Sequence, residues 1–148
     1  RLKCAIFLAA ANLGFDLSNP KWGAVNQKNL KILVVDDEEV VAEVLGKLIE
    51  IDGHNVAVTL EGKKALEIYQ KERFDVVFTD ISMPEMNGID LTQKLLEMDK
   101  DTKIVAVTGH VGTQEIEKIL NAGAKTFLKK PFTKKEIDYK IEEVLRID

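Results

Sequence analysis

The sequence has 148 residues, enough for one domain of ordinary size with its own hydrophobic core. With 45% hydrophobic and 31% charged residues the chain reads as globular rather than disordered, and its net charge of −4 argues against direct nucleic-acid binding, since nucleic-acid-binding faces are usually basic. Cys4 is the only cysteine, which excludes an intrachain disulfide and favours the reducing cytoplasm, and no apolar run reaches the roughly 20 residues that span a membrane.

Residues 1–29 differ from the rest of the chain and are interpreted as an extension ahead of a domain over residues 30–148. The apolar run Cys4–Ala11, with Gly14 after it, predicts a short helix over about residues 3–12, and turn residues beyond it predict a linker. Basic residues before a short apolar run are also typical of a secretory signal, an interpretation that we set aside because the sequence starts with Arg rather than Met.

The origin of this extension stays open at the level of sequence. It is a vector-derived tail, the end of a preceding domain, or an apolar helix that docks on the domain or on a second copy of the chain. A homodimer through the extension is therefore one arrangement that we consider.

From Leu30 onward, short apolar runs alternate with stretches of helical periodicity. The apolar runs are rich in β-branched residues and predict five strands, over residues 31–35, 56–59, 74–78, 103–107 and 125–128. Apolar residues spaced three and four apart predict five helices, over residues 38–51, 61–71, 89–98, 113–121 and from a capping box at Thr133 and Glu136 onward. This alternation predicts an α/β fold with a parallel sheet covered by helices on both faces.

The helical periodicity also predicts which side chains face the core. In the first helix these are Val41, Val44, Leu45, Leu48 and Ile49. In the later helices they are Ala65, Leu66, Tyr69, Leu91, Leu95, Leu96, Ile137, Ile141, Val144 and Leu145.

Polar side chains stand where four of the predicted strands end. Asp36 and Asp37 follow the first strand, Asp80 the third, Thr108 the fourth and Lys130 the fifth. Because the carboxyl ends of parallel strands meet at one edge of a sheet, we expect these groups to lie close together. Two carboxylates ~5 Å apart repel by about 3 kcal/mol at an effective dielectric near 20, so three of them need a cation or a raised pKa.

Hard oxygen ligands with an incomplete shell suit Mg²⁺, which keeps several waters and takes a further ligand from a phosphate. Lys130 and the Thr108 hydroxyl would then contact phosphoryl oxygens. The sequence therefore predicts a phosphoryl site in which a carboxylate is the nucleophile and forms an aspartyl phosphate.

The chain resembles the receiver domain of two-component response regulators over residues 30–147. The matching motifs occur in order at the strand ends: Val34-Val-Asp-Asp-Glu38, Thr79-Asp-Ile-Ser-Met-Pro84 with Gly88, Val107-Thr-Gly109, Ala122-Gly-Ala124 and Phe127-Leu-Lys-Lys-Pro-Phe132. The resemblance implies a doubly wound, flavodoxin-like sheet of five parallel strands in the order 2-1-3-4-5.

The resemblance also implies the chemistry of the site. Asp80 would be the phosphoacceptor, supplied by a phosphohistidine on a histidine kinase or a histidine phosphotransfer protein. Asp37 would bind Mg²⁺ directly, Asp36 mainly through water, and the backbone carbonyl of Ser82 would be the third protein ligand. Lys130 would hold a phosphoryl oxygen, and its bond to Pro131 is expected to be cis.

The resemblance also implies a conformational switch and residues that set the lifetime of the phosphoryl group. The Thr108 hydroxyl would move towards the phosphoryl group, and Phe127 would turn inward with it. The surface of the fourth helix, fifth strand and fifth helix would then change, so that a downstream protein partner, or a second copy in a homodimer, reads it. Ser82 and His110 flank the path of the attacking water, and we expect them to tune the dephosphorylation rate.

These residues also allow other interpretations. Phe127 is by ordinary expectation a core aromatic, and His54 an inert turn residue. An alternative function is a phosphatase with an aspartate nucleophile, but that class places its nucleophile after the first strand with a second acid two residues later, which Asp36-Asp37-Glu38 fits poorly. A phosphorylation-independent binding module would not need the intact acids. As an enzyme, the receiver would only phosphorylate itself and hydrolyse the product slowly.

Overall fold

The structure is a computed structural model, and it describes residues 29–109 and 112–146. The predicted N-terminal helix and His110 lie outside the described residues. The expected division into residues 1–29 and 30–148 therefore stays a prediction.

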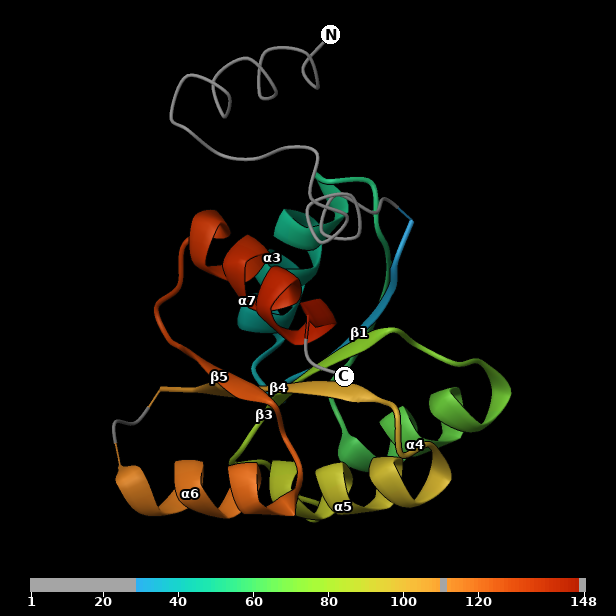
Figure 1. The fold of residues 1–148 in the computed structure, drawn as a ribbon, viewed down its shortest axis with the longest axis vertical. Coiled ribbons are helices and arrows are strands. Elements are labelled where there is room, and N and C mark those ends of the chain that lie inside the picture. Colours follow the sequence, from blue (N-terminus) through green and yellow to red (C-terminus); the bar gives the residue numbers. More distant parts are fainter. Residues whose placement is uncertain (1–28, 110–111, 147–148) are drawn as a thin grey trace, which may run out of the picture.

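The core of the described chain is one parallel sheet of five strands in the order β2-β1-β3-β4-β5 (Figure 1). The strands are β1 (Lys31–Val35), β2 (Asn55–Thr59), β3 (Val76–Asp80), β4 (Lys103–Thr108) and β5 (Thr126–Lys129). The predicted sheet, its parallel direction and the strand order are all confirmed. The three central strands are buried along nearly their whole length because helices cover both of their faces.

Five helices of the described residues form a layer on each side of this sheet (Figure 1). They are α3 (Glu39–Glu50), α4 (Gly62–Lys71), α5 (Gly88–Met98), α6 (Thr113–Ala122) and α7 (Lys134–Arg146). Helices α3 and α7 cover one face, and α4, α5 and α6 cover the other.

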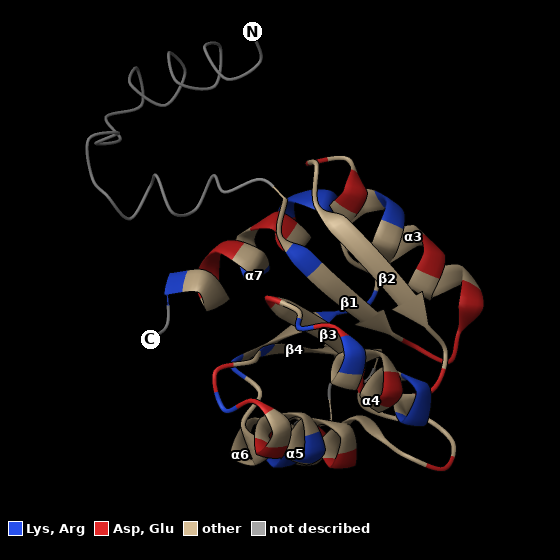
Figure 2. Cartoon of the chain, turned by 90° about the vertical axis from the view of Figure 1, so that its right-hand side faces the viewer, with Lys and Arg blue, Asp and Glu red and all other residues tan. Residues whose placement is uncertain are grey.

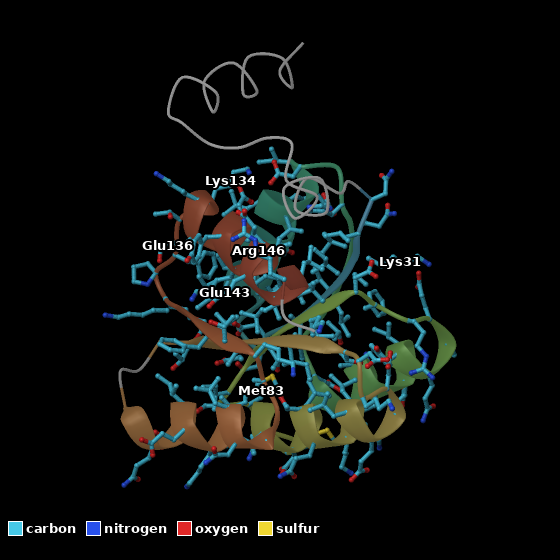
Figure 3. All side chains as sticks on the ribbon, in the orientation of Figure 1. Lys31, Met83, Lys134, Glu136, Glu143 and Arg146 are labelled. Carbon is cyan, nitrogen blue, oxygen red and sulfur yellow. The ribbon has the colours of Figure 1, made fainter. Side chains whose placement is uncertain are left out.

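Two apolar cores follow from the alternation of side chains along the strands. Ile32 and Val34 of β1 point towards α3 and α7, whereas Leu33 and Val35 point towards α4, α5 and α6. The β3–α5 loop adds Met83 to the second core, where its side chain lies between the sheet and the α5–α6 layer (Figure 3). Both cores hold the carboxyl ends of β1, β3 and β4 at a fixed separation.

The predicted element boundaries are right to within one or two residues. The largest shift is in β3, which begins at Val76 rather than Phe74 and runs to Asp80 itself. Phe74 remains buried as part of the approach to the strand. The last residue of β3 is therefore the acid on which the predicted site depends.

Two residues of α3 that were predicted to face the core, Val41 and Val44, lie outside both core clusters. Val44 was expected to face the core, but 47% of it is exposed, whereas Ala42, Leu45 and Ile49 are buried. The reason is that α3 carries more apolar residues than one face can hold. Periodicity alone could not tell its inner stripe from its outer one.

The predicted cap at the start of the last helix is present. Thr133 Oγ1 accepts a hydrogen bond from the Glu136 backbone N–H at 3.2 Å and also contacts the Glu136 carboxylate, so α7 begins on a capping box. Lys134, at the same end of α7 (Figure 3), lies 2.7 Å from both Asp52 and Asp138, which ties α7 to the end of α3. No helix within the described ranges is long and apolar enough to cross a bilayer.

Candidate functional site

Four strand ends bring polar side chains to one edge of the sheet. Asp36 follows β1, Asp80 ends β3, Thr108 ends β4 and Lys130 follows β5. Parallel pairing fixes their relative height, because Asp80 pairs with Val107 and Thr108 pairs with Lys129. These residues therefore lie at the same carboxyl edge of the sheet, as predicted.

Lys130 is the cation of this edge. Its Nζ lies 2.8 Å from Asp36 Oδ2, 3.5 Å from Asp80 Oδ2 and 3.9 Å from Glu38 Oε1. Burial disfavours the charged ammonium, but the neighbouring carboxylates outweigh burial and raise the pKa of Lys130 above its ordinary value. One ammonium therefore faces three carboxylates, which leaves the cluster with excess negative charge.

The position of Lys130 is set by the backbone around it. The Lys130 N–H donates to the Thr108 carbonyl oxygen at 2.7 Å, which extends the β4–β5 pairing by one residue. The Lys130–Pro131 peptide bond is cis, as predicted. Thr108 itself is buried and stands beside this link, on the strand next to Asp80.

The three acids around Lys130 form a compact set of oxygens. Ligand atoms of Asp36, Glu38 and Asp80 all lie within 4.8 Å of one another. Asp36 is only 1% exposed, and its Oδ1 accepts the Glu38 backbone N–H at 2.9 Å. Its Oδ2 is buried and has the Lys130 ion pair but no well-directed hydrogen bond. A buried carboxylate oxygen left in that state fits a site for a cation.

Asp80 is held partly protonated near neutral pH in the absence of a metal. Burial is the main cause, and the negative charge of Asp36 adds to it, while Lys130 opposes both. Together these effects raise the pKa of Asp80 to about 7. A second cation beside Lys130 would favour the ionised carboxylate, which is the nucleophilic form.

Gly88 explains how the loop after β3 closes around Asp80. Its N–H donates to the Ile81 carbonyl oxygen at 2.8 Å. A Cβ at this position would overlap the Asp80 carbonyl oxygen and would lie 2.9 Å from Ile81 Cα. Only glycine allows this approach of two backbones, which places the start of α5 directly against the end of β3. Asn87 caps that helix by accepting the Asp90 N–H at 2.9 Å.

Ser82 lies in the same loop, two residues beyond Asp80, and its side chain is exposed. It lines a shallow cleft of about 420 Å³ together with Ile81, Met83 and Pro84 of the loop and with Lys118 of α6. His110, its expected counterpart, lies outside the described residues. Solvent therefore has access to the loop beside Asp80 from the Ser82 side.

The acids that follow β1 differ in their positions, and the predicted role of Asp37 as a direct metal ligand stays a prediction. Asp37, expected to bind metal directly, is exposed and is not part of the compact oxygen set. Glu38, for which no role in the site was predicted, is part of it. The run of three consecutive acids in the sequence was the feature that could have indicated a role for Glu38. A shift of one residue in the start of α3 decides whether Asp37 or Glu38 faces Lys130.

Phe127 is not a core residue. Strand β5 is an edge strand with alternating burial, and Phe127 is 37% exposed on its outer side. Lys140 Nζ lies 5.7 Å from the centroid of its ring. A groove of about 440 Å³ runs here between β5 and α7, lined by Phe127, Leu128, Lys129, Thr133, Lys135, Glu136, Tyr139 and Lys140. The alternative of an ordinary core aromatic is therefore wrong.

Comparisons with known proteins agree with this arrangement. The family model described as response regulator receiver domain matches residues 32–142. The chain is 34% identical over 119 residues to the chemotaxis protein CheY of Treponema pallidum, covering 78% of this chain and 83% of that protein. It is 35% identical over 118 residues to the transcriptional regulatory protein CpxR of Escherichia coli, covering 78% of this chain and 49% of that protein.

The solved structures agree as well. A CheY-like response regulator receiver domain protein from Methanospirillum hungatei superposes with a TM-score of 0.76 at 28% identity, over 80% of this chain and 95% of that one. The chain spans about half the length, or less, of several other curated relatives that it matches. A match of the family model to most of the chain, with its acids and lysine at one sheet edge, leads to one conclusion: the chain belongs to the receiver-domain family of two-component response regulators, in which acceptance of a phosphoryl group is general.

Proposed function

We propose that Asp80 accepts a phosphoryl group from a phosphohistidine on a histidine kinase or a histidine phosphotransfer protein. The observation that carries this proposal is the buried Asp80 carboxylate, 3.5 Å from the Lys130 ammonium and within the same oxygen set as Asp36. A nucleophilic carboxylate and a cation for the transferred oxygens thus stand side by side. This observation supports Asp80, Asp36 and Lys130 as members of the site, and Asp37 and Thr108 are added to the proposal from the family resemblance.

The proposed transfer is a single displacement at phosphorus. An oxygen of Asp80 forms a bond to phosphorus, the phosphorus–nitrogen bond of the donor breaks, and the imidazole leaves and takes up a proton. Lys130 moves from Asp80 to the new phosphoryl oxygens, while Asp36 keeps its ammonium oriented through the 2.8 Å ion pair. Water later attacks phosphorus, which returns the Asp80 carboxylate and releases inorganic phosphate. The chain turns over no external substrate in this scheme, in keeping with a family of signalling domains.

Receiver domains typically use Mg²⁺, and the residues here fit it. The donors are hard carboxylate oxygens, and Asp36 Oδ2 is buried without a directed hydrogen bond. Asp36, Asp37, Asp80 and the Ser82 backbone carbonyl would hold the ion, with Glu38 close enough to take part. When bound, Mg²⁺ would neutralise the carboxylates and the incoming phosphoryl charge.

The switch is proposed to run along β4 and β5. The Thr108 hydroxyl would turn towards the phosphoryl group, and Phe127 on the neighbouring strand would move into the space that it leaves. The exposure of Phe127 supports this proposal, because an outward ring has somewhere to go. The surface formed by α6, β5 and α7, which includes the groove at Phe127, would then present a different shape to a downstream partner or to a second copy.

The lifetime of the phosphoryl group is proposed to depend on Ser82 and His110. The exposed, small Ser82 leaves room for water beside Asp80. If Ser82→Met and His110→Ala both leave the phosphoryl half-life unchanged, this part of the proposal is wrong.

The test of the function is activation with beryllofluoride and Mg²⁺, followed by amide NMR. We expect beryllofluoride to shift the signals of Thr108, Phe127 and the α6–β5–α7 surface in the parent chain. Asp80→Asn, which is nearly isosteric but removes the charged oxygen, should show no such shifts. A response of this variant equal to that of the parent would remove Asp80 from the role of acceptor.

A further inference from the structure

Helix α3 carries an apolar stripe on its solvent side. Val40, Val44 and Ile51 are spaced four and seven residues apart, which places them within about 40° of one another around a helix. They are 73%, 47% and 67% exposed, although Ala42 and Ile49 on the opposite side of the same helix are fully buried. This α3 stripe (Val40, Val44, Ile51) is thus a second apolar face, separate from the one that packs on the sheet. The exposed Lys47 stands between Val44 and Ile51, with its ammonium 3.6 Å from the Glu50 carboxylate.

The surroundings of the stripe extend and mark it. Val41 and Leu48 flank it on one side and are half-buried, and Leu48 packs against the core. Three exposed acids, Glu39, Glu43 and Glu50, form a parallel row on its other side, and Figure 2 shows this acidic character along α3. A helix with apolar and basic residues would complement such a face.

The chain itself contains a segment of this chemistry. The run Cys4–Ala11 is apolar throughout, and Arg1 and Lys3 precede it. Residues 1–28 hold four basic residues and one acid, a net charge of +3, whereas residues 29–148 carry −7. The net charge of this segment is therefore opposite in sign to that of the acidic row of α3.

The place where the chain enters the domain favours this contact. The Leu30 N–H donates to His54 Nδ1 at 3.3 Å, and the Leu30 carbonyl oxygen accepts the Asn55 N–H at 2.8 Å. The chain therefore enters next to His54 and Asn55, at the end of the turn that begins at Ile51. Residues 13–28 can span up to about 50 Å when extended, and α3 is only about 18 Å long, so every point of the stripe is within reach.

We propose that residues 3–12 form an apolar helix that docks on the α3 stripe of the same chain. The apolar side of the segment covers Val40, Val44 and Ile51, and its basic start lies by the acidic row. The stripe begins two residues after Glu38, so the docked segment borders the carboxylate site. This contact does not depend on the proposed function of Asp80.

The natural Cys4 thiol reports on the docking in the full chain. We expect its reaction with dithiobis(nitrobenzoate) to be at least tenfold slower in the parent chain than in Val44→Asp, which places a charge in the stripe. Gln93→Asp introduces the same charge on an exposed position of α5 and should leave the Cys4 rate as slow as in the parent. Circular dichroism checks that both variants keep the fold. A Cys4 that reacts equally fast in all three chains overturns the proposal.

A second measurement separates docking within the chain from docking on a neighbour. Cysteine is introduced at Val40, Val44 or Lys47, with Gln93→Cys as the control, and oxidised glutathione is added. We expect at least one α3 position to form a disulfide with Cys4 within a monomer, at a rate independent of protein concentration, and Gln93→Cys to remain reduced. Disulfide-linked dimers, or a protection of Cys4 that rises with concentration, would assign the stripe to a second copy and overturn the proposal.

Discussion

The ammonium nitrogen of Lys130 lies 2.8 Å from Oδ2 of the buried Asp36, closer than it lies to Asp80. Asp36 therefore orients the lysine, and Asp80 is left with a longer and weaker contact. This asymmetry suits a site in which the Lys130 ammonium must move from the Asp80 carboxylate to an oxygen of the phosphoryl group. It also means that Lys130 supports the folded state as well as the chemistry.

Replacing Lys130 should lower both stability and phosphorylation. Lys130→Ala leaves Asp36 and Asp80 without their cation, and the free energy of unfolding at pH 8 should fall by about 2 kcal/mol, because removal of one partner strands buried charge. Protonation of Asp80 limits the loss. Urea unfolding in EDTA measures the first effect. The rate of phosphorylation by phosphoramidate, which we expect to fall at least tenfold, measures the second.

Lys129→Ala is the matched control for that experiment. Lys129 is the neighbouring residue, and its side chain is exposed at the groove rather than at the acids. It should change stability by less than about 0.5 kcal/mol and leave the phosphorylation rate unchanged. Equal effects of the two substitutions would mean that the contacts of Lys130 with the acids are without consequence.

The raised pKa of Asp80 predicts a pH dependence of stability in the metal-free chain. The folded value is about 7 and the ordinary value is 3.8, so between these two values the folded chain keeps a proton that the unfolded chain loses. The contribution of Asp80 to the free energy of unfolding therefore falls as pH rises through this range, and is constant above it.

Asp80→Asn removes this titration and should be more stable than the parent above neutral pH. We expect a gain of about 1–2 kcal/mol at pH 8, after allowance for solvent screening at the open side of the site, that disappears towards pH 4. Chemical unfolding in EDTA at a series of pH values gives the comparison. A difference between the two chains that does not vary with pH would show that Asp80 titrates normally.

Two neighbouring acids can be ranked as Mg²⁺ ligands by calorimetry. By family resemblance Asp37 is a direct ligand, and we expect Asp37→Asn to weaken Mg²⁺ binding about tenfold. We expect Glu38→Gln to weaken it less than about threefold, because the loss of a direct ligand costs more affinity than the loss of a neighbouring charge. Glu43→Gln, on the exposed side of α3, controls for the general loss of a negative charge. The reverse order would make Glu38, which lies in the compact oxygen set, the direct ligand.

Gly88 should tolerate no side chain. Gly88→Ala forces a Cβ into the Asp80 carbonyl oxygen and against Ile81 Cα, so we expect a loss of about 2–4 kcal/mol in the free energy of unfolding, together with weaker Mg²⁺ binding. Gly109→Ala is the control, because a Cβ there meets only the Lys130 Cδ at 3.9 Å. If both variants unfold at the same denaturant concentration as the parent, the close approach at Gly88 is not required.

Much of this fold was accessible from sequence because its signals are strong and mutually consistent. Buried β-branched runs predicted β1, β3 and β4, with the acids and the threonine at their ends, and the lysine followed the run that predicted β5. Val44 shows where periodicity fails, since an amphipathic helix with apolar residues on two sides does not say which side is inside. Phe127 shows the same for strands, because an edge strand buries only alternate residues and the sequence does not mark the edge.

The fine geometry of the site depended on tertiary structure. Whether Asp37 or Glu38 turns towards Lys130 depends on where α3 begins, a matter of one residue. The close approach of the Gly88 backbone to Asp80 depends on the path of the loop between β3 and α5, which no local pattern encodes.

The most direct test of the central claim is the intact mass of the chain after incubation with phosphoramidate in the presence of Mg²⁺. The phosphorus–nitrogen bond of phosphoramidate stands in for that of phosphohistidine. We predict that the parent chain gains the mass of one phosphoryl group, that borohydride reduction locates it at Asp80, and that Asp80→Asn gains nothing under the same conditions. A gain of one phosphoryl group by Asp80→Asn at the rate of the parent would contradict the assignment of Asp80 as the acceptor.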